Sequence, residues 1–192
     1  YGGQALGLSV ADTTRLTALL AGGTLVGFGF ASRYLGTGGD PMVLGRSGAA
    51  IGIPGFGAIV LASQMVGAPL FVAGTVATGL GAGLFGHATL TATIRAAPRG
   101  HIGLALGAWG AVQATAAGIG VALGGILRDL IFAFATDSSG LSAATPYNII
   151  FVVEMLCLAL AVVVALPLLG SRRHSSGPAT LPGLDAEPRE AP

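Results

Sequence analysis

The sequence predicts an all-α membrane protein with five transmembrane helices. Hydrophobic residues make up 53% of the 192 residues and charged residues only 9%, and the mean hydropathy is +0.80. A soluble domain carries about 25% charged residues, so a water-soluble fold is excluded. Several uncharged stretches are long enough to cross about 30 Å of hydrocarbon as helices. The 33 glycines are typical of closely packed membrane helices in a chain this apolar.

The first three spans follow from the positions of charged residues. An apolar stretch predicts the first span over residues 16–35. Residues 47–94 contain no Asp, Glu, Lys or Arg, and one helix of that length would measure about 70 Å, so this stretch must reverse direction once. Polar residues, a Gly and a Pro place the turn at residues 63–69. The second and third spans are therefore expected over residues 44–62 and 69–94.

Two further spans complete the predicted set. The next uncharged stretch predicts a fourth span over residues 102–127, and a fifth is expected over residues 147–169, interrupted only by Glu154. Residues 128–146 connect these two spans. The first part of this connection either extends the fourth helix or lies at the membrane interface, and its second part is expected to be a polar loop.

The predicted organisation is a helical membrane domain, residues 1–170, followed by a disordered polar tail, residues 171–192. Loops rich in basic residues stay in the cytoplasm. Only Arg15 and Arg128 fall on one predicted side of the membrane. The arginines on the other side are Arg33, Arg46, Arg95, Arg99, Arg172, Arg173 and Arg189. This imbalance predicts that the C-terminus lies in the cytoplasm. Because the chain opens at Tyr1 without a Met or a signal pattern, we expect a piece of a longer protein.

Composition and motifs also exclude several classes of function. The net charge is +1 and no basic helix is present, so nucleic-acid binding is not expected. The lone Cys157 excludes an intrachain disulfide, and no Cys/His spacing suggests a metal site. The sequence has no nucleophile elbow, phosphate loop, His-Glu-x-x-His motif or paired catalytic carboxylates. We therefore expect neither an enzyme nor a metal centre.

Four polar or aromatic residues within the spans are candidates for function. His87 is the only titratable group in the third span. Its imidazole either ligates the metal of a tetrapyrrole or forms a hydrogen bond to a neighbouring helix. Trp109 lies at nearly the same depth and either lines a pigment site with His87 or packs among glycines. Gln113 contacts substrate or joins two helices. Glu154 is costly to bury unless it is paired or protonated, so it is either a proton-coupling group or has a local partner such as Arg128.

Small residues four positions apart form stripes along several predicted helices. Such stripes let helix backbones approach closely in lipid. They indicate static packing, helices that move against each other, or a cavity for a flat ligand. The residues are Gly23 and Gly27, Gly79 and Gly83, Gly103, Gly107 and Ala111, and Gly110, Ala114, Gly118 and Ala122.

Several segments resemble the second half of the PucC/LhaA family, the bacteriochlorophyll delivery group of the major facilitator superfamily. The strongest similarity is over residues 97–118, Ala-Pro-Arg-Gly-His-Ile-Gly-Leu-Ala-Leu-Gly-Ala-Trp-Gly-Ala-Val-Gln-Ala-Thr-Ala-Ala-Gly. Residues 1–10, 79–91 and 124–129 add to it. The resemblance implies that the five helices are part of a twelve-helix major facilitator fold. It also implies a multi-pass protein of the bacterial inner membrane, either the cytoplasmic membrane or the intracytoplasmic photosynthetic membrane. It assigns no role to individual residues.

Three functions remain after this resemblance is considered. The first is an assembly factor for light-harvesting antennas that binds bacteriochlorophyll, or delivers it to antenna polypeptides, and catalyses no covalent reaction. The second is a proton-coupled or facilitative small-solute transporter that uses Glu154. The third is a permanent structural subunit of a photosynthetic complex. The resemblance places the first function ahead.

Overall fold

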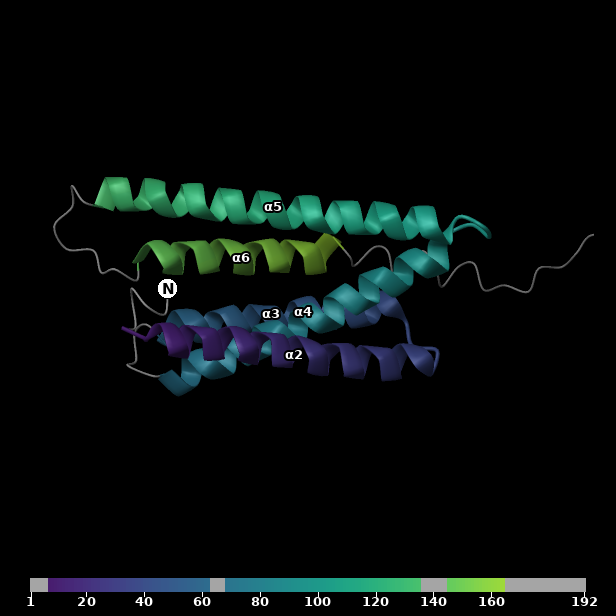
Figure 1. Cartoon of the computed structure of the whole chain (residues 1–192), viewed down its shortest axis with the longest axis horizontal. Coiled ribbons are helices and arrows are strands. Elements are labelled where there is room, and N and C mark those ends of the chain that lie inside the picture. Colours follow the sequence, from purple (N-terminus) through teal and green to yellow (C-terminus); the bar gives the residue numbers. More distant parts are fainter. Residues whose placement is uncertain (1–6, 63–67, 136–144, 165–192) are drawn as a thin grey trace, which may run out of the picture.

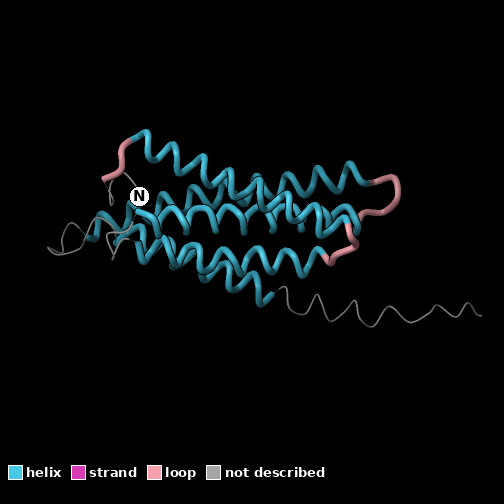
Figure 2. Tube along the Cα trace, turned by 90° about the horizontal axis from the view of Figure 1, so that it is seen from below, coloured by secondary structure: helices cyan, strands magenta, loops and turns pink. Residues whose placement is uncertain are grey.

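The computed structural model describes residues 7–62, 68–135 and 145–164. This described part folds into five α-helices, which lie roughly along a common axis (Figures 1 and 2). Each helix is long and apolar enough to cross a membrane. The prediction of an all-α protein with five membrane helices is confirmed. The helices are α2 (Val10–Gly36), α3 (Pro41–Ala62), α4 (Ala68–Ala96), α5 (Ile102–Ala135) and α6 (Thr145–Val164).

Helices α2 and α5 extend furthest beyond the predicted spans, whereas the other helices begin within about three residues of the predicted positions. Helix α2 begins at Val10 because Ser9 caps it: the Ser9 hydroxyl accepts a hydrogen bond from the Asp12 backbone N–H at 3.2 Å. Helix α5 continues to Ala135, so the first part of the 128–146 connection extends the fourth helix. Arg128 does not end this helix; its guanidinium forms an ion pair with Asp129 at 2.7 Å.

Some expectations concern residues outside the described part of the chain. They are most of the predicted turn at residues 63–69, the polar half of the 128–146 connection, the end of the fifth span beyond Val164, and the tail, residues 171–192.

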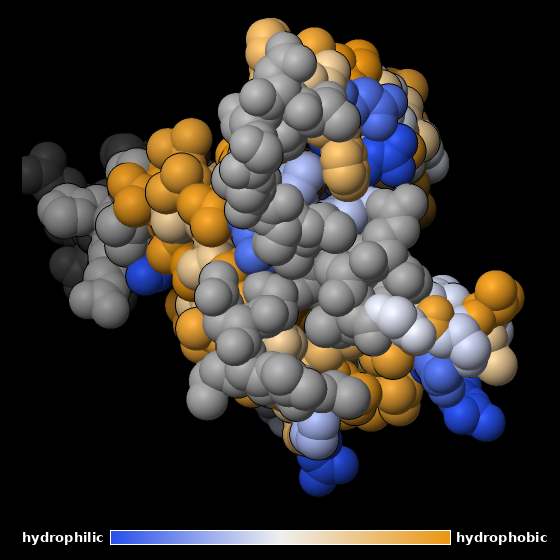
Figure 3. Space-filling view, turned by 90° about the vertical axis from the view of Figure 1, so that its left-hand side faces the viewer, coloured by the Kyte–Doolittle hydropathy of each residue, from blue (hydrophilic) through white to orange (hydrophobic). Residues whose placement is uncertain are grey.

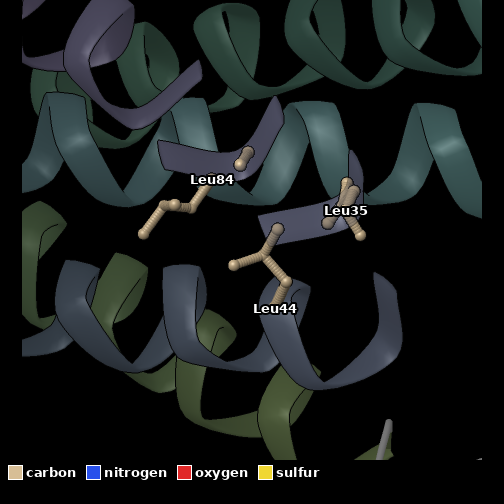
Figure 4. Packing of buried hydrophobic residues seen from close by; sticks show 5 residues of the cluster. Leu35, Leu44 and Leu84 are labelled. Atoms are coloured by element: carbon tan, nitrogen blue, oxygen red, sulfur yellow. The ribbon is translucent and has the colours of Figure 1, made fainter. Parts of the chain in front are cut away.

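Helix α4 packs against both α2 and α3, and the best-buried side chains lie where the three helices meet. Leu35 of α2, Leu44 of α3 and Leu84 of α4 converge there (Figure 4) and are at most 9% exposed. Helix α6 packs against α3, where Phe151 stacks on Phe56 with ring centroids 5.9 Å apart. Helices α2, α3 and α4 therefore form the core, and α6 lies against it.

Glycines bring the backbones of α2 and α4 into direct contact. Gly23 and Gly27 of α2 face the segment of α4 that carries Gly79 and Gly83. A Cβ atom added to Gly27 would lie 2.5 Å from the Leu80 carbonyl oxygen and 3.1 Å from the Gly83 Cα. The two predicted stripes on these helices are therefore packing surfaces for each other.

Helix α5 is attached to the other helices mainly near its two ends. Trp109 contacts α4 near one end, and Phe132 meets Tyr147 of α6 near the other, with ring centroids 6.2 Å apart. Between these contacts every residue from 111 to 123 is exposed. The glycine stripes of α5 therefore have no packing partner in the described part of the chain, unlike those of α2 and α4.

The connections from α2 to α3 and from α4 to α5 lie at the same end of the molecule (Figure 1). Arg95, in the last turn of α4, links this helix to the end of α2 and to the α2–α3 connection. Its guanidinium donates hydrogen bonds to the carbonyl oxygens of Leu35 in α2 at 3.3 Å and Gly39 in the connection at 3.0 Å. Figure 3 views the molecule from the opposite end, and hydrophobic side chains cover much of the surface that it shows. Along the helices, exposed large hydrophobic side chains such as Leu25, Leu104 and Val121 form the kind of surface that faces lipid.

Candidate functional site

His87 lies on α4, at its boundary with α2. Its ring is half-buried, and its centroid is 5.9 Å from that of Phe28 of α2, with the two rings tilted by 56°. Neither imidazole nitrogen has a hydrogen-bond partner among the described residues. The neighbouring Gly86 leaves space: a Cβ atom there would meet only Phe28, at 3.7 Å. The structure therefore presents an imidazole with free ligand capacity beside an exposed aromatic ring.

Trp109 contacts a different face of α4 from the one that carries His87. Its indole N–H donates a hydrogen bond to the Thr89 hydroxyl at 3.3 Å. Thr89 follows His87 by two positions, which turns it about 200° around the helix. The structure therefore does not bring His87 and Trp109 together, although they lie at similar depths.

Trp109 instead lines a cleft of about 530 Å³ where α4 and α5 diverge. Apart from Thr93 and the indole itself, the side chains that line this cleft are apolar. The other lining residues are Ala96, Ala97, Pro98, Ala105, Ala108 and Val112. Such a cleft suits an apolar or flat occupant with few polar groups.

Gln113 and Glu154 are exposed, on α5 and α6 respectively. Neither has a hydrogen bond or an ion pair to another residue that the structure describes. Arg128, the local partner considered for Glu154, pairs with Asp129 instead. The four candidate residues therefore occupy separate places and do not form one assembled site.

A buried hydroxyl that sequence reasoning missed lies between α3 and α4. The Thr78 hydroxyl oxygen has no hydrogen-bond partner in the described structure and adjoins Gly55, the residue after Pro54. It borders a cavity of about 240 Å³ that Phe56 and Leu158 also line. The sequence shows a proline, Pro54, inside the second predicted span. No sequence pattern indicates that the segment around it packs against Thr78.

Comparisons with known proteins identify the family of this chain. The family model described as PUCC protein matches residues 1–173. Protein PucC of Rhodobacter capsulatus is 57% identical over 171 residues, which cover 88% of this chain and 37% of that protein. Protein PucC of Cereibacter sphaeroides is 53% identical over 171 residues, covering 89% and 37%. No solved structure matches.

A more distant relative carries an enzyme name. The bacteriochlorophyll synthase 44.5 kDa chain of Rhodobacter capsulatus is 28% identical over 191 residues, 95% of this chain and 42% of that protein. The chain spans 37% of the length of each of the two PucC proteins. Five candidate spans and a family match over residues 1–173 lead to one conclusion: this multi-pass membrane chain belongs to the PUCC protein family.

Proposed function

We propose that this chain is part of a non-enzymatic factor that assists assembly of light-harvesting antennas and binds bacteriochlorophyll or delivers it to antenna polypeptides. The observation behind this proposal is the 57% identity to Protein PucC, together with the antenna role that the family resemblance implies. The name of the more distant relative, bacteriochlorophyll synthase 44.5 kDa chain, favours a pigment of that class. The proposed location is the inner or intracytoplasmic photosynthetic membrane, with the C-terminus in the cytoplasm.

His87 is the residue that we propose to hold the pigment. A neutral imidazole is a good metal ligand, and a polar group without a partner in hydrocarbon is unfavourable. The His87 nitrogens have no hydrogen-bond partner among the described residues. Phe28 lies beside the ring, and Gly86 adds no side chain that would block a flat macrocycle. These features fit an axial ligand to the central metal of a tetrapyrrole.

Trp109 and Gln113 are proposed as contacts on a second surface. They lie on α5, away from the face of α4 that presents His87, and Trp109 lines the apolar cleft between α4 and α5. A pigment held by His87 would not touch this cleft through the residues described. We therefore assign the cleft either to the pigment at a later step of its delivery or to a segment of an antenna polypeptide.

The test is to purify the full-length protein from a pigment-producing host and to record its absorption spectrum. His87→Ala should remove most of the copurifying bacteriochlorophyll. His101→Ala is the matched control, because His101 is an exposed residue outside the helices, and it should leave the pigment in place. The pigment site is wrong if no bacteriochlorophyll copurifies with the wild type and His87→Ala leaves antenna assembly normal.

Transport with Glu154 as the proton-coupling group is the alternative. The observation that favours this alternative is a carboxylate on an apolar helix: Glu154 of α6 has no ion-pair partner among the described residues. Glu154→Gln should abolish pH-dependent solute uptake in reconstituted vesicles if this alternative holds. Equal uptake by the wild type and the variant would remove the alternative.

A further inference from the structure

The charged residues at the two ends of the helices are arranged differently. At the end where α2 begins and α5 ends, the described arginines are paired: Arg15 with Asp12 at 3.1 Å and Arg128 with Asp129 at 2.7 Å. At the end that carries the α2–α3 and α4–α5 connections, here called the connection end, no arginine forms an ion pair with another described residue. The described arginines at the connection end are Arg33, Arg46, Arg95 and Arg99.

Among the described residues, Asp40 is the one acid at the connection end, and its carboxylate already has a partner. It accepts a hydrogen bond from the Met42 backbone N–H at 2.7 Å, at the start of α3. The Arg95 guanidinium also has partners, the carbonyl oxygens of Leu35 and Gly39. The excess of arginines over acids gives the connection end a net positive charge, which attracts anions.

Arg46 differs from the other arginines at the connection end in its burial. Arg33, Arg95 and Arg99 are exposed, whereas Arg46 is only partly exposed. Its Nε atom is buried and has no hydrogen-bond partner in the part of the chain that the structure describes. A buried N–H of a charged group without an acceptor is more unfavourable than an unpaired neutral group. Since the side chain as a whole is partly exposed, an anion can still reach the terminal nitrogens of the guanidinium.

Arg46 lies on the side of α3 that borders α6. Gly57, about three turns further along this side, would place an added Cβ atom 3.8 Å from the Met155 methyl group. A Cβ atom added to Gly52 would lie 2.9 Å from a terminal methyl group of Leu158. Residue numbers in α6 therefore rise as those in α3 fall. Since Arg46 precedes Gly52 by six positions, it is level with the last described turn of α6.

The position of Arg46 along α3 places its guanidinium within reach of lipid phosphates. Helix α3 has 22 residues, a length of about 33 Å, which is close to the ~30 Å thickness of the hydrocarbon core. Arg46 follows Pro41, the first residue of α3, by five positions, so its Cα lies about 7.5 Å inside the start of the helix. An arginine at such a depth extends its charged group to the membrane interface. Basic sites between helices at a membrane surface bind anionic headgroups.

We propose that Arg46, at the boundary of α3 and α6, binds the phosphate of an anionic phospholipid through two parallel N–H···O hydrogen bonds. The planar guanidinium suits this bidentate contact, and the phosphate supplies the negative charge that no described residue gives to Arg46. Ala50 and Ile53 follow Arg46 on the same side of α3, and both are apolar and at least partly exposed. They offer a surface to the acyl chains, so the site suits a lipid better than a soluble anion. This inference concerns a lipid and is independent of pigment binding.

Native mass spectrometry of the full-length protein in detergent, titrated with phosphatidylglycerol, tests this site. Arg46→Gln removes the guanidinium, and Arg33→Gln is the matched control because it removes the same charge from an exposed position at the same end. Arg46→Gln should raise the dissociation constant of phosphatidylglycerol about tenfold, since charge-assisted hydrogen bonds are strong. Arg33→Gln should change it less than about twofold, because single exposed charges contribute little. Equal dissociation constants in the wild type and Arg46→Gln, or an equal loss in both variants, would overturn the proposal.

Two further titrations separate this site from a folding defect and from a soluble anion. Arg46→Lys keeps the positive charge but lacks the planar fork, so it should bind phosphatidylglycerol about threefold more weakly than the wild type. If Arg46→Gln does not fold, this variant decides, and binding equal to the wild type contradicts the bidentate contact. Inorganic phosphate in excess should not displace the lipid from the wild type. Displacement would reveal a site for soluble anions and overturn the assignment to a phospholipid.

Discussion

Gly27→Ala should destabilise the protein, although alanine is the better helix former. The added Cβ atom would lie 2.5 Å from the Leu80 carbonyl oxygen, whereas ordinary van der Waals contact begins at 3.4 Å. Helices α2 and α4 must therefore move apart locally by about 0.9 Å, the difference between these two distances. A gap of 0.5–1 Å forfeits about a quarter to a half of the dispersion energy of the atoms that it separates.

The expected loss of stability is about 1–3 kcal/mol, which is typical of overpacking in a close-packed interior. The Tm change per kcal/mol is about 2–4 °C for 150–250 residues and smaller for a larger protein. Gly29 is the matched control on the same helix, because a Cβ atom there meets nothing within 4 Å. Gly29→Ala should be neutral or slightly stabilising, since alanine is favoured over glycine by up to about 1 kcal/mol.

Thermal unfolding of the full-length protein in detergent, followed by scanning fluorimetry, measures both substitutions under the same conditions. A lower Tm for Gly27→Ala with an unchanged or higher Tm for Gly29→Ala is the expected pattern. If the two variants unfold at the same temperature, α2 and α4 are not in backbone contact at Gly27, and the argument from the glycine stripes fails.

Three further contacts can be tested by substitution. Ser9→Ala removes the N-cap of α2 and should lower stability by about 1 kcal/mol, measured as a lower Tm; no change would mean that the capping contact does not form. Arg95→Ala removes the hydrogen bonds to Leu35 at the end of α2 and to Gly39 in the α2–α3 connection. It should accelerate amide exchange in this region, whereas Arg99→Ala should not; equal exchange in the two variants would contradict these hydrogen bonds. Trp109→Phe and Thr89→Val each remove the same hydrogen bond, so a double-mutant cycle of Tm values should give a coupling of about 1 kcal/mol, and additive effects would exclude the contact.

The number and type of helices could be predicted because the bilayer sets a length that charge-free segments must match. Residues 47–94 are too long for one span, so a reversal was required, and the structure has separate helices α3 and α4. The stripes at Gly23 and Gly79 also indicated close packing in advance. Spacing alone identified these surfaces, but it could not tell which stripes face each other within the chain and which face outward.

Helix ends were less predictable because hydropathy reports where a segment is apolar and not where its backbone hydrogen bonds end. Ser9 and Asp12 are polar, so they lay outside the predicted span, although together they begin α2. Arg128 was taken as the end of an apolar stretch, but a charged residue does not by itself end a helix, and α5 continues to Ala135. The Ser-x-x-Asp pattern at the start of α2 was the signal that could have located its true beginning.

The candidate site shows a second limit of reasoning from depth. His87 and Trp109 have similar positions along the membrane normal, which suggested a common site. Contact depends also on rotation about each helix axis, and the indole reaches Thr89 instead. That rotation follows from how α5 packs against α4, which neither the hydropathy nor the spacing of charged residues reports.

The attachment of α5 near its two ends also bears on how the chain is assembled in the membrane. Helices α2, α3 and α4 bury their best-packed residues among themselves, so they can associate soon after insertion. Helix α5 satisfies its backbone hydrogen bonds internally and exposes apolar side chains to lipid, so it is stable as an individual span before any partner arrives. We therefore expect stepwise assembly in the membrane, in which α2, α3 and α4 associate first and α5 packs against other helices afterwards.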